Sequence, residues 1–306
     1  MKNLKVSIIL ATLNEEDDVE DFLRSLRKQT YKNYELIVID GGSTDRTIDI
    51  VKKYTNQIFV RKTPLAECWN FGARKSKGGI LHFMPADDVM KSKNYLKILV
   101  KTYIKYRADS VAIRTFSTKP NNLLGRAQKA YRRTQWENRQ KKIIDMSNSP
   151  KIFSGGSFLK KSFFKIGGFN PKLKGSEDQN ITMRAIKNNL RIIFNPAVLL
   201  YHKDPYTYSQ IARQGKWYGR VLRQAKLIDK IRTIGLVSVF FFLYPLSILL
   251  LVNEFYLPFI IFQMLYFSRV LYIFYFSRDF LGSFYQVYVM NPIRSIYFYT
   301  GFFLNK

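Results

Sequence analysis

Two adjacent carboxylates, Asp87 and Asp88, stand where a metal-dependent reaction could take place. They follow the apolar run Ile80–Met84 after two residues. Hard divalent cations take carboxylate oxygens as ligands and keep further positions for phosphate. Aspartate is also a favoured N-cap residue, so the pair is compatible with the start of a helix near Lys91. Position alone leaves the metal site and the helix cap as equal alternatives.

A second acidic pair, Glu177 and Asp178, lies later in the chain. It follows Gly175 and lies at the start of a helical pattern over Ser176–Asn188. A carboxylate at a helix start is stabilised by the helix dipole. Acidic residues are also common at helix starts for stability alone.

Strands and helices that alternate over the first hundred residues would position these groups. Apolar runs at Val6–Leu10, Leu36–Ile39 and Ile80–Met84 are typical of buried strands. Amphipathic segments at Glu15–Arg27 and from Thr47 onward lie between them. This alternation predicts a parallel sheet wound by right-handed crossovers. Ligands bind at the carboxyl ends of such strands, where three polar clusters fall: Thr12–Glu16, Asp40–Asp45 and Asp87–Asp88.

The middle of the chain predicts further elements of the same domain. Leu123–Ile144 is helical and strongly basic, Ile152–Phe169 is glycine-rich, and Arg191–Tyr201 has the pattern of a strand. The single cysteine, Cys68, cannot form an intrachain disulfide and is interpreted as a small buried residue.

Two long apolar stretches near the C-terminus predict membrane attachment. Ile234–Val252 is uncharged and about long enough to span a bilayer, and Leu257–Phe276 follows after a short polar link. Arg232 and Arg278 flank the far ends, which predicts a hairpin with both ends in the cytoplasm. Arg269 lies inside the second stretch at a cost of about 2.5 kcal/mol or more, so a pair of re-entrant or interfacial helices is the alternative.

Residues 1–230 are expected to form one domain, and residues 231–306 a membrane-anchoring region. That region would hold the hairpin and an aromatic tail, Asp279–Lys306, interpreted as an interfacial helix. The apolar run Val6–Ala11 is too short for a signal peptide.

The charge balance is strongly basic. Lys and Arg number 50 against 22 Asp and Glu, a formal net charge of +28. Such a chain attracts nucleic acid, phosphorylated substrates or acidic lipid headgroups. The basic segment Arg126–Lys142 makes a nucleic-acid-binding protein an alternative, but no segment resembles a known nucleic-acid module, and no nucleic acid partner is expected.

Several motifs occur in an order typical of one enzyme family. They are SIILATLNEEDDVEDFLRSLRKQTYKNYELIVIDGGSTDRT at Ser7–Thr47, Asn70-Phe71-Gly72-Ala73, Gly78-Gly79, Asp87-Asp88, FSGGSFLKKSFFKIGGFNPKLKGSEDQNITMRA at Phe153–Ala185, and NPAVLLYH at Asn195–His202. With these motifs about two thirds of the chain closely resembles the family 2 glycosyltransferases. The resemblance implies the GT-A fold, a Rossmann-like α/β domain that binds nucleotide-diphosphate sugars, followed here by C-terminal membrane-associated helices.

The resemblance also implies a set of donor-binding residues: Thr12, Asn14, Glu16, Asp40, Asn70, Asp87 and Gly156. Asp40 would accept a hydrogen bond from the base, Asn70 would lie near the donor, and Gly156 would let the backbone approach the sugar closely. Taken alone, Asp40 is also interpretable as a turn residue and Asn70 as a helix cap.

A divalent metal, Mn²⁺ or Mg²⁺, is implied at the acidic pair. The family's motif is usually Asp-X-Asp, whereas this chain has Pro85-Ala86-Asp87 followed by Asp88. Because the first carboxylate is missing, Asp87 becomes the expected direct ligand and Asp88 binds metal, water or donor sugar. His202 stands where relatives place a further metal-side group, although a packed histidine at a strand end is the simpler interpretation.

The resemblance assigns catalysis to the second acidic pair. Asp178 matches the general base, which takes the proton of the acceptor hydroxyl, and Glu177 would orient the base or the acceptor. The expected enzyme is an inverting hexosyltransferase with a UDP- or GDP-type donor. Its catalytic domain would face the cytoplasm at the cell membrane, and its acceptor would be lipid-linked or a surface glycan.

Alternative enzymes share parts of this pattern. A polyprenyl-phosphate sugar transferase fits the membrane region, and a nucleotidyltransferase fits an acidic metal site on an α/β sheet. Pro85 makes a membrane scaffold with a degenerate transferase domain a further alternative. The basic aromatic cluster Arg213–Arg220 would hold diphosphate or serve only as a juxtamembrane anchor.

Overall fold

The chain forms two compact units in a computed structural model. Met1–Phe116 with Gln140–Lys203 make up the first unit, and Ser117–Arg139 with Asp204–Lys306 the second. The structure describes residues 4–117, 122–132, 142–148, 156–173, 175, 177–203, 207–222, 246, 248–253 and 256–303.

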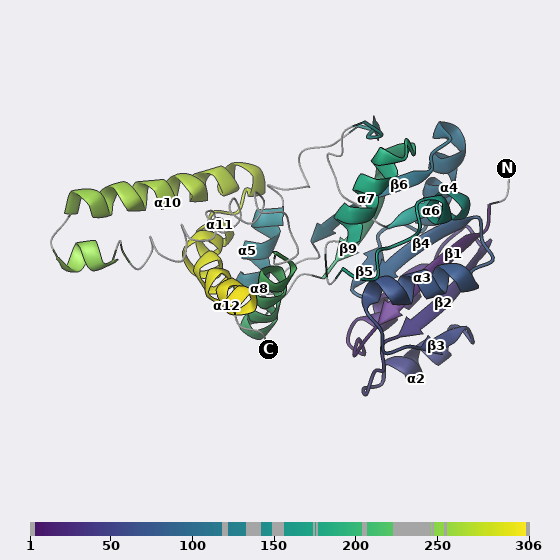
Figure 1. The fold of residues 1–306 in the computed structure, drawn as a ribbon. Coiled ribbons are helices and arrows are strands. Elements are labelled where there is room, and N and C mark those ends of the chain that lie inside the picture. Colours follow the sequence, from purple (N-terminus) through teal and green to yellow (C-terminus); the bar gives the residue numbers. More distant parts are fainter. Residues whose placement is uncertain are drawn as a thin grey trace. The chain divides into compact units, whose positions relative to one another are not determined.

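The first unit is built on a mixed nine-stranded sheet (Figure 1). The strand order is β3-β2-β1-β4-β8-β6-β9-β5, with β7 paired to β9. The strands are β1 Val6–Thr12, β2 Tyr34–Asp40, β3 Ile58–Val60, β4 Ile80–Pro85, β5 Asp88–Met90, β6 Ser110–Ser117, β7 Ile144–Asp145, β8 Ser157–Leu159 and β9 Ile192–His202. The prediction of an α/β fold with a sheet in the first hundred residues is therefore confirmed.

Parallel pairing brings three predicted site segments to one edge of the sheet. Strand β1 pairs in parallel with β2 and β4, with Thr12 opposite Asp40 and Ala11 opposite Pro85. The carboxyl ends of these three strands therefore lie side by side. The polar residues that follow each strand are grouped at that edge, as the sequence predicts.

The parallel sheet predicted for the first hundred residues is confirmed for β1, β2, β3 and β4 but not for β5, and the strands after residue 100 add antiparallel pairs. Strand β8 runs antiparallel to β4 and β6, and β5 and β7 run antiparallel to β9. Strand β5 begins at Asp88, three residues after Pro85 ends β4. A parallel neighbour needs a crossover of about a dozen residues, so this short link directs β5 away from β4 and onto β9.

Amphipathic helices cover the sheet. They are α1 Val19–Arg27, α2 Thr47–Lys52, α3 Leu65–Lys75, α4 Tyr95–Tyr106, α6 Lys160–Lys165 and α7 Glu177–Lys187. Helix α1 buries Val19, Phe22, Leu23 and Leu26, the apolar positions of its sequence pattern. These side chains join the inward faces of β1, β2 and β4 in one core, which makes the sheet edge a rigid support.

The predicted helix over Leu123–Ile144 is too long. Helix α5 ends at Arg132, and Ile144 with Asp145 forms β7 on β9. Residues 133–141 lie outside the described part of the chain. Pairing with β9 outweighs the local helical periodicity at Ile144, because the ladder supplies hydrogen bonds that a helix end would lack.

The second unit is helical. Its elements are α5 Leu123–Arg132, α8 Tyr208–Leu222, α10 Tyr256–Ser277, α11 Phe280–Tyr285, a π-helical turn Gln286–Met290 and α12 Asn291–Phe303. Helix α12 packs along α8, while α5 packs against α10 and α11. Buried side chains from these helices form the unit's own small cores: Leu124, Ala127, Ala130, Ile211, Tyr266, Val270, Ile273, Val287 and Met290.

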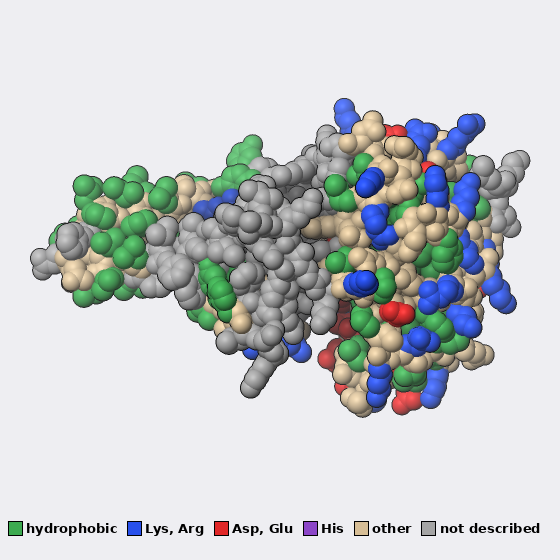
Figure 2. Space-filling model, viewed as in Figure 1, with side chains coloured by type: hydrophobic (Ala, Val, Ile, Leu, Met, Phe, Trp, Pro, Cys, Tyr) green, Lys and Arg blue, Asp and Glu red, His purple; other side chains and the backbone are tan. Residues whose placement is uncertain are grey.

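Helix α10 contains the segment Tyr256–Tyr275, which by length and composition could cross a membrane. Hydrophobic side chains are exposed along it (Figure 2), with Leu257 and Met264 more than 60% accessible. The second predicted apolar stretch, residues 257–276, thus lies within one helix. Most of the first stretch, residues 234–252, falls outside the described residues, so the hairpin stays a prediction. The tail forms α11, the π-helical turn and α12, and its place at a membrane interface also stays a prediction.

Candidate active site

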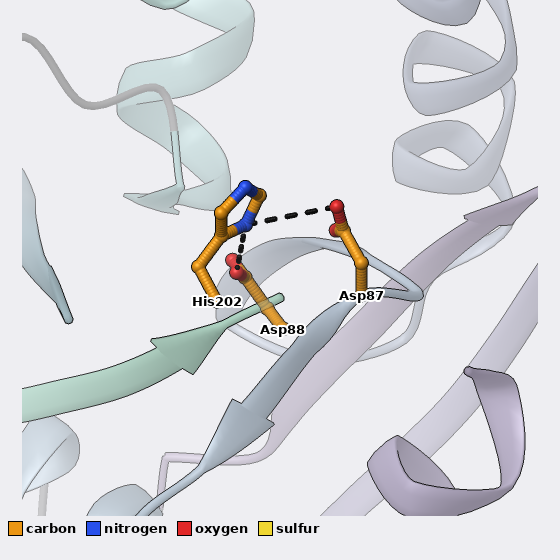
Figure 3. A group of neighbouring side chains, drawn as sticks. All are labelled: Asp87, Asp88 and His202. Carbon is orange, nitrogen blue, oxygen red and sulfur yellow. Dashed lines mark hydrogen bonds and ion pairs between the residues drawn. The ribbon is translucent and has the colours of Figure 1, made fainter. Parts of the chain in front are cut away.

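Asp87, Asp88 and His202 come together at the carboxyl edge of the sheet (Figure 3). The pairing of β5 with β9 places Asp88 directly opposite His202, although 114 positions separate them in the chain. Nδ1 of His202 lies 2.8 Å from Oδ1 of Asp88 and 3.7 Å from Oδ2 of Asp87. A ligand atom from each residue lies within 4.8 Å of the other two. One ion could contact all three groups.

The helix-cap interpretation of the acidic pair is wrong. Asp88 is the first residue of β5, and the next helix, α4, begins at Tyr95 after an N-cap at Asn94. Neither carboxylate therefore serves a helix start. The two side chains flank the β4–β5 turn, where they face His202.

One oxygen of the Asp87 carboxylate faces His202, and the other has no hydrogen-bond donor among the described residues. This second oxygen, Oδ1, is buried. Burial raises the pKa of Asp87, His202 opposes this effect, and the neighbouring Asp88 carboxylate adds to it. A buried acceptor without a donor is costly, and a bound divalent cation would remove that cost. Two carboxylates and an imidazole therefore fit a metal ion.

Glu15 and Lys203 extend this site and were missed at the sequence level. Burial raises the pKa of Glu15 to about 7, with repulsion from Asp87 as the next cause. The Lys203 backbone N–H donates to the Asp87 carbonyl at 3.0 Å, and its ammonium group pairs with Asp18 in the loop before α1. Lys203 thus ties that loop to the acidic pair. Glu15 lies inside the predicted polar cluster Thr12–Glu16 and Lys203 adjoins His202, but no motif assigned either residue a role.

The predicted nucleotide residues lie in two loops that hold each other. The Asn14 backbone N–H donates to the Ser43 hydroxyl, and the Asn14 side-chain oxygen accepts from the Thr44 N–H, both at 2.9 Å. The Glu16 carboxylate accepts from the backbone and side chain of Arg46, at 3.2 and 3.1 Å. Asn14 adopts a left-handed backbone, with φ of 55°, which asparagine tolerates better than most residues. The loops at 12–16 and 41–47 therefore form one rigid unit.

Asp40 is the centre of this loop unit. It is fully buried, and its Oδ1 accepts from the backbone N–H groups of Gly42 and Ser43, at 2.8 and 2.7 Å. Its Oδ2 accepts from the hydroxyls of Thr12 and Ser43, at 2.8 and 2.6 Å. The turn-organising interpretation of Asp40 is thus correct. Its contact with the base stays a prediction, and so does the place of Thr12 in the nucleotide pocket.

Asn70 is not a helix cap, because it lies in the middle of α3. Its side-chain amide forms two hydrogen bonds with the backbone of Phe169, a donation to the carbonyl at 2.8 Å and an acceptance from the N–H at 2.9 Å. These two hydrogen bonds attach the Gly167-Gly168-Phe169 turn to α3. A role beside the donor stays a prediction.

The carbonyl of Gly156 is held by β4. It accepts from the Phe83 N–H and from Nδ1 of His82, each at 2.7 Å. Because a carbonyl only accepts, Nδ1 of His82 donates to Gly156, while Nε2 lies 3.0 Å from the Tyr95 hydroxyl. Burial lowers the pKa of His82 to about 4, which keeps the ring neutral near pH 7. His82 was not singled out in the sequence, because nothing in an apolar strand run indicates a partner outside it.

Glu177 and Asp178 begin α7, as the sequence predicts. Glu177 is half-buried, and burial raises its pKa, with the Asp178 charge as a further cause. The Asp178 side chain is exposed, yet the protein around it still raises its pKa. A carboxylate with a raised pKa and access to solvent can accept a proton from a ligand hydroxyl.

Comparison with known proteins gives a family match and more distant relatives. The model of the protein family described as Glycosyl transferase family 2 matches residues 7–167. The poly(ribitol-phosphate) beta-N-acetylglucosaminyltransferase TarS of Staphylococcus aureus is 28% identical over 200 residues, which are 62% of this chain and 34% of TarS. A dolichyl N-acetyl-alpha-D-glucosaminyl phosphate 3-beta-D-2,3-diacetamido-2,3-dideoxy-beta-D-glucuronosyltransferase of Methanococcus voltae is 23% identical over 246 residues, 70% of this chain and 71% of that enzyme.

Solved structures share the fold. S. aureus TarS 1-349 in complex with UDP-GlcNAc aligns with a TM-score of 0.52 at 20% identity, over 73% of this chain and 68% of that one. The mannosyltransferase PcManGT from Pyrobaculum calidifontis, in complex with GDP-Man and Mn²⁺, aligns with the same score and identity, over 73% of this chain and 65% of that one. At these identities the likeness shows the fold alone. The chain spans only about a third of the length of the curated relatives it matches first.

Proposed function

The chain belongs to glycosyl transferase family 2, and we propose that it is an inverting enzyme that transfers a sugar from a nucleoside-diphosphate sugar to a lipid-linked or surface-glycan acceptor. The cluster of Asp87, Asp88 and His202 carries this proposal, because it offers three metal ligands and a buried oxygen without a partner at the sheet edge. The paired loops at 12–16 and 41–47 adjoin that edge.

Asp87, Asp88 and His202 would hold Mn²⁺ or Mg²⁺. Such an ion neutralises the negative charge that develops on the diphosphate leaving group. Burial, and then the charge of Asp87, raise the pKa of Glu15, and the positive charge of a bound ion would oppose that rise. Glu15 is therefore assigned to the support of the metal site. Lys203 keeps the loop before α1 against it.

Asp178 would act as the general base. It takes the proton of the acceptor hydroxyl while that oxygen attacks the anomeric carbon from the face opposite the nucleotide. The new carbon–oxygen bond forms as the bond to the diphosphate breaks, and the nucleoside diphosphate leaves with the electron pair. A single displacement inverts the anomeric configuration. Glu177 would orient the acceptor or the base.

The donor is proposed to be of the UDP or GDP type. The structural neighbours named above hold UDP-GlcNAc and GDP-Man, and this chain shares their fold. Thr12, Asn14, Glu16 and Asp40 would shape the nucleotide pocket through the rigid loop unit. Asn70 and Gly156 would shape the sugar side through the backbone segments that they anchor or form.

Membrane attachment is proposed from α10. Its exposed apolar side chains and its length fit a bilayer span, and an enzyme held at a bilayer meets lipid-borne acceptors. The names of the relatives point the same way, because one acts on poly(ribitol-phosphate) and another on a dolichyl-linked sugar phosphate. We assign residues 1–230 to the catalytic domain, on the cytoplasmic side, and residues 231–306 to the anchor.

Product analysis tests this function. The full-length protein in detergent is incubated with UDP- and GDP-sugars, Mn²⁺ and a lipid extract, and the released nucleotide is identified. Release of UDP or GDP with label transfer to lipid or glycan is expected, and it should be lost in Asp178→Asn. Release of inorganic diphosphate would instead identify a nucleotidyltransferase, and turnover unchanged in Asp178→Asn would overturn the assigned base.

A further inference from the structure

A cavity of about 660 Å³ lies in the second unit, where α10 turns into α11 beside α5. Three cationic side chains and one carboxylate line it: Arg126, Lys129, Arg278 and Asp279. The remaining walls come from Ala130, Ser277, Phe280 and Leu281. None of these residues belongs to the proposed transferase site.

The single carboxylate is already neutralised. Arg126 donates to both oxygens of Asp279, from Nε at 3.0 Å and from Nη2 at 2.7 Å. The Gly282 N–H also donates to Asp279, at 2.9 Å. These bonds fix the carboxylate at the start of α11, so Asp279 is a structural partner of Arg126.

Two positive charges remain to face the cavity. Lys129 makes no ion pair with any residue of the described chain, and it is half-buried. The Arg278 guanidinium carbon lies 5.6 Å from the centre of the Tyr275 ring, which holds the group without neutralising it. Arg278 has a left-handed backbone, with φ of 55°, and this ends α10 and turns the chain toward α11. The cavity thus presents two cations that an anion could bind together.

The cavity also adjoins the apolar surface of α10. The candidate span ends at Tyr275, three residues before Arg278. Phe280 and Leu281, on the cavity wall, are 46% and 49% exposed. The phosphates of a bilayer lie just outside its hydrocarbon core, so a span ending at Tyr275 sets Lys129 and Arg278 at the level of the headgroups.

We propose that this cavity binds the phosphate of a membrane lipid headgroup, with Lys129 and Arg278 as its ligands and the exposed side chains of α10 and α11 against the acyl chains. The inference rests on the proposed membrane attachment of α10. A free phosphate would satisfy the two cations but would leave the apolar wall exposed. The combination of cations with that wall favours the lipid.

Thermal unfolding of the full-length protein in a non-ionic detergent tests the site. The probes are phosphatidic acid, diacylglycerol with the same acyl chains, and inorganic phosphate. Phosphatidic acid should raise the melting temperature of the wild type, whereas the other two should not. The double variant Lys129→Gln/Arg278→Gln should bind phosphatidic acid about 30-fold more weakly, because each cation near a membrane surface contributes about a fivefold factor.

Two further variants keep the result interpretable. Lys97→Gln/Lys101→Gln removes the same charge from exposed positions of α4 in the first unit, and it should respond like the wild type. Lys129→Gln alone breaks no ion pair with a residue that the structure describes, so it is expected to fold and to bind about fivefold more weakly.

An equal response of the pocket variants and the α4 control would overturn the proposal. An equal response to inorganic phosphate would assign the cavity to a soluble anion instead, and an equal response to diacylglycerol would show that the headgroup is not bound. The melting temperature is measured without sugar transfer. A negative result for lipid binding therefore leaves the proposed transferase activity standing, and a negative result for sugar transfer leaves the lipid site standing.

Discussion

Nδ1 of His202 lies 2.8 Å from Oδ1 of Asp88, across the antiparallel pairing of β9 with β5. This hydrogen bond joins the last residue of one strand to the first residue of another. It orients both groups beside Asp87, whose Oδ1 has no donor. The three proposed metal ligands are therefore held together by sheet pairing.

The first prediction concerns metal binding. Mn²⁺ should raise the melting temperature of the wild-type protein, because a ligand that binds only the native state stabilises it. Asp87→Asn should abolish this increase, since it removes the ligand charge at the unpaired oxygen. His202→Gln should lower the affinity by at least about 10- to 100-fold, the range for loss of an outer-shell group, because it removes a proposed direct ligand. Differential scanning fluorimetry with a Mn²⁺ titration measures both.

A matched control lies on α2. Asp49 is exposed and forms a surface ion pair with Lys52, so Asp49→Asn removes one carboxylate that is not among the proposed metal ligands. It should keep the wild-type response to Mn²⁺. A Mn²⁺ effect that survives in Asp87→Asn but not in Asp49→Asn would contradict the assigned site.

The second prediction uses the buried His82. Burial lowers its pKa to about 4, compared with 6.5 in the unfolded chain. The unfolded state therefore binds the proton more tightly, and the stability from neutral His82 is fully present above pH 6.5 and lost as the pH falls toward 4. The loss amounts to about 3 kcal/mol for a shift of this size. His82→Gln, which cannot titrate, should lack this component of the pH dependence.

Unfolding midpoints measured between pH 4 and 7 for both proteins give the comparison. The difference in stability between wild type and His82→Gln should shrink steadily as the pH falls. A constant difference across that range would mean that His82 is not buried as a neutral ring between Gly156 and Tyr95.

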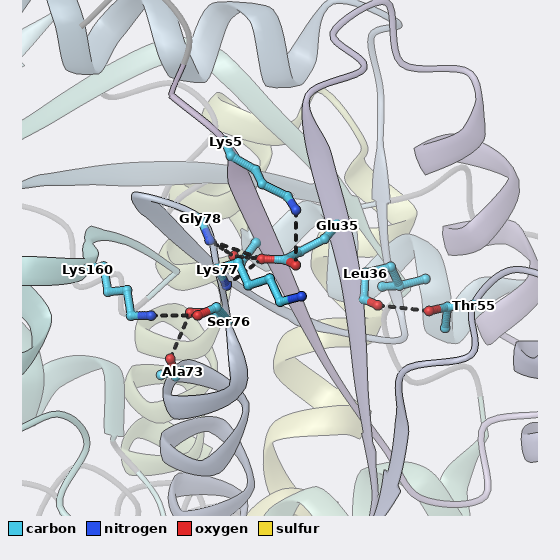
Figure 4. Close-up of polar contacts among 10 residues, drawn as sticks. Lys5, Glu35, Leu36, Thr55, Ala73, Ser76, Lys77, Gly78 and Lys160 are labelled. Carbon is cyan, nitrogen blue, oxygen red and sulfur yellow. Dashed lines mark hydrogen bonds and ion pairs between the residues drawn. The ribbon is translucent and has the colours of Figure 1, made fainter.

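The third prediction concerns Gly78, which lies against β1 beside the buried carboxylate of Glu35 (Figure 4). Glu35 accepts hydrogen bonds from the Ser7 hydroxyl and from the N–H groups of Lys77 and Gly78. A Cβ at Gly78 would lie 2.5 Å from the Ser7 oxygen and 2.6 Å from the Lys5 carbonyl. Gly78→Ala should therefore destabilise the protein by about 1–3 kcal/mol.

Gly79 provides the matched control in the next position. A Cβ there meets only the end of the Leu4 side chain, at 3.3 Å, which can move. Gly79→Ala should lower the free energy of unfolding by much less than Gly78→Ala does, as measured by thermal or chemical unfolding. Equal losses in the two variants would argue against a tight packing of Gly78 on β1.

The fold was predictable where local periodicity and topology agree. The apolar runs that became β1, β2 and β4 are long enough to show a pattern, and the intervening helices supply the parallel crossovers. Strands β5, β7 and β8 have two or three residues each and carry no periodicity of their own. They form because β9, β4 and β6 pair with them, and these partner strands are distant in the sequence. A local sequence pattern cannot predict such pairing.

The site was predictable to the extent that motifs mark it. Asp87, Asp88 and His202 were named from the sequence, and the structure brings them together. Glu15 and Lys203 were missed because their coupling to Asp87 arises only when the loop before α1 meets the end of β9. Asp40 is a different case. The motif predicts that it is a site residue, but only its hydrogen bonds to Gly42 and Ser43 show that it organises its own loop.

The last prediction concerns the proposed base at the start of α7. Asp178→Asn keeps the shape of the side chain but cannot accept the acceptor's proton, so kcat should fall about 10²- to 10⁴-fold with little change in KM for the donor. Glu177→Gln, which changes the neighbouring group, should have a smaller effect on kcat. Initial rates of nucleoside diphosphate release from full-length protein with saturating acceptor measure both.

The pH profile distinguishes a base from a binding residue. Desolvation by the surrounding protein raises the pKa of Asp178, although the side chain is exposed. Because the base works only when it is deprotonated, the acid limb of kcat should lie above the ordinary range of an aspartate. The rate should rise with pH through that limb and then level off. In Asp178→Asn the residual rate should lose this limb while thermal stability is retained. An acid limb that persists in Asp178→Asn would move the role of base to another group.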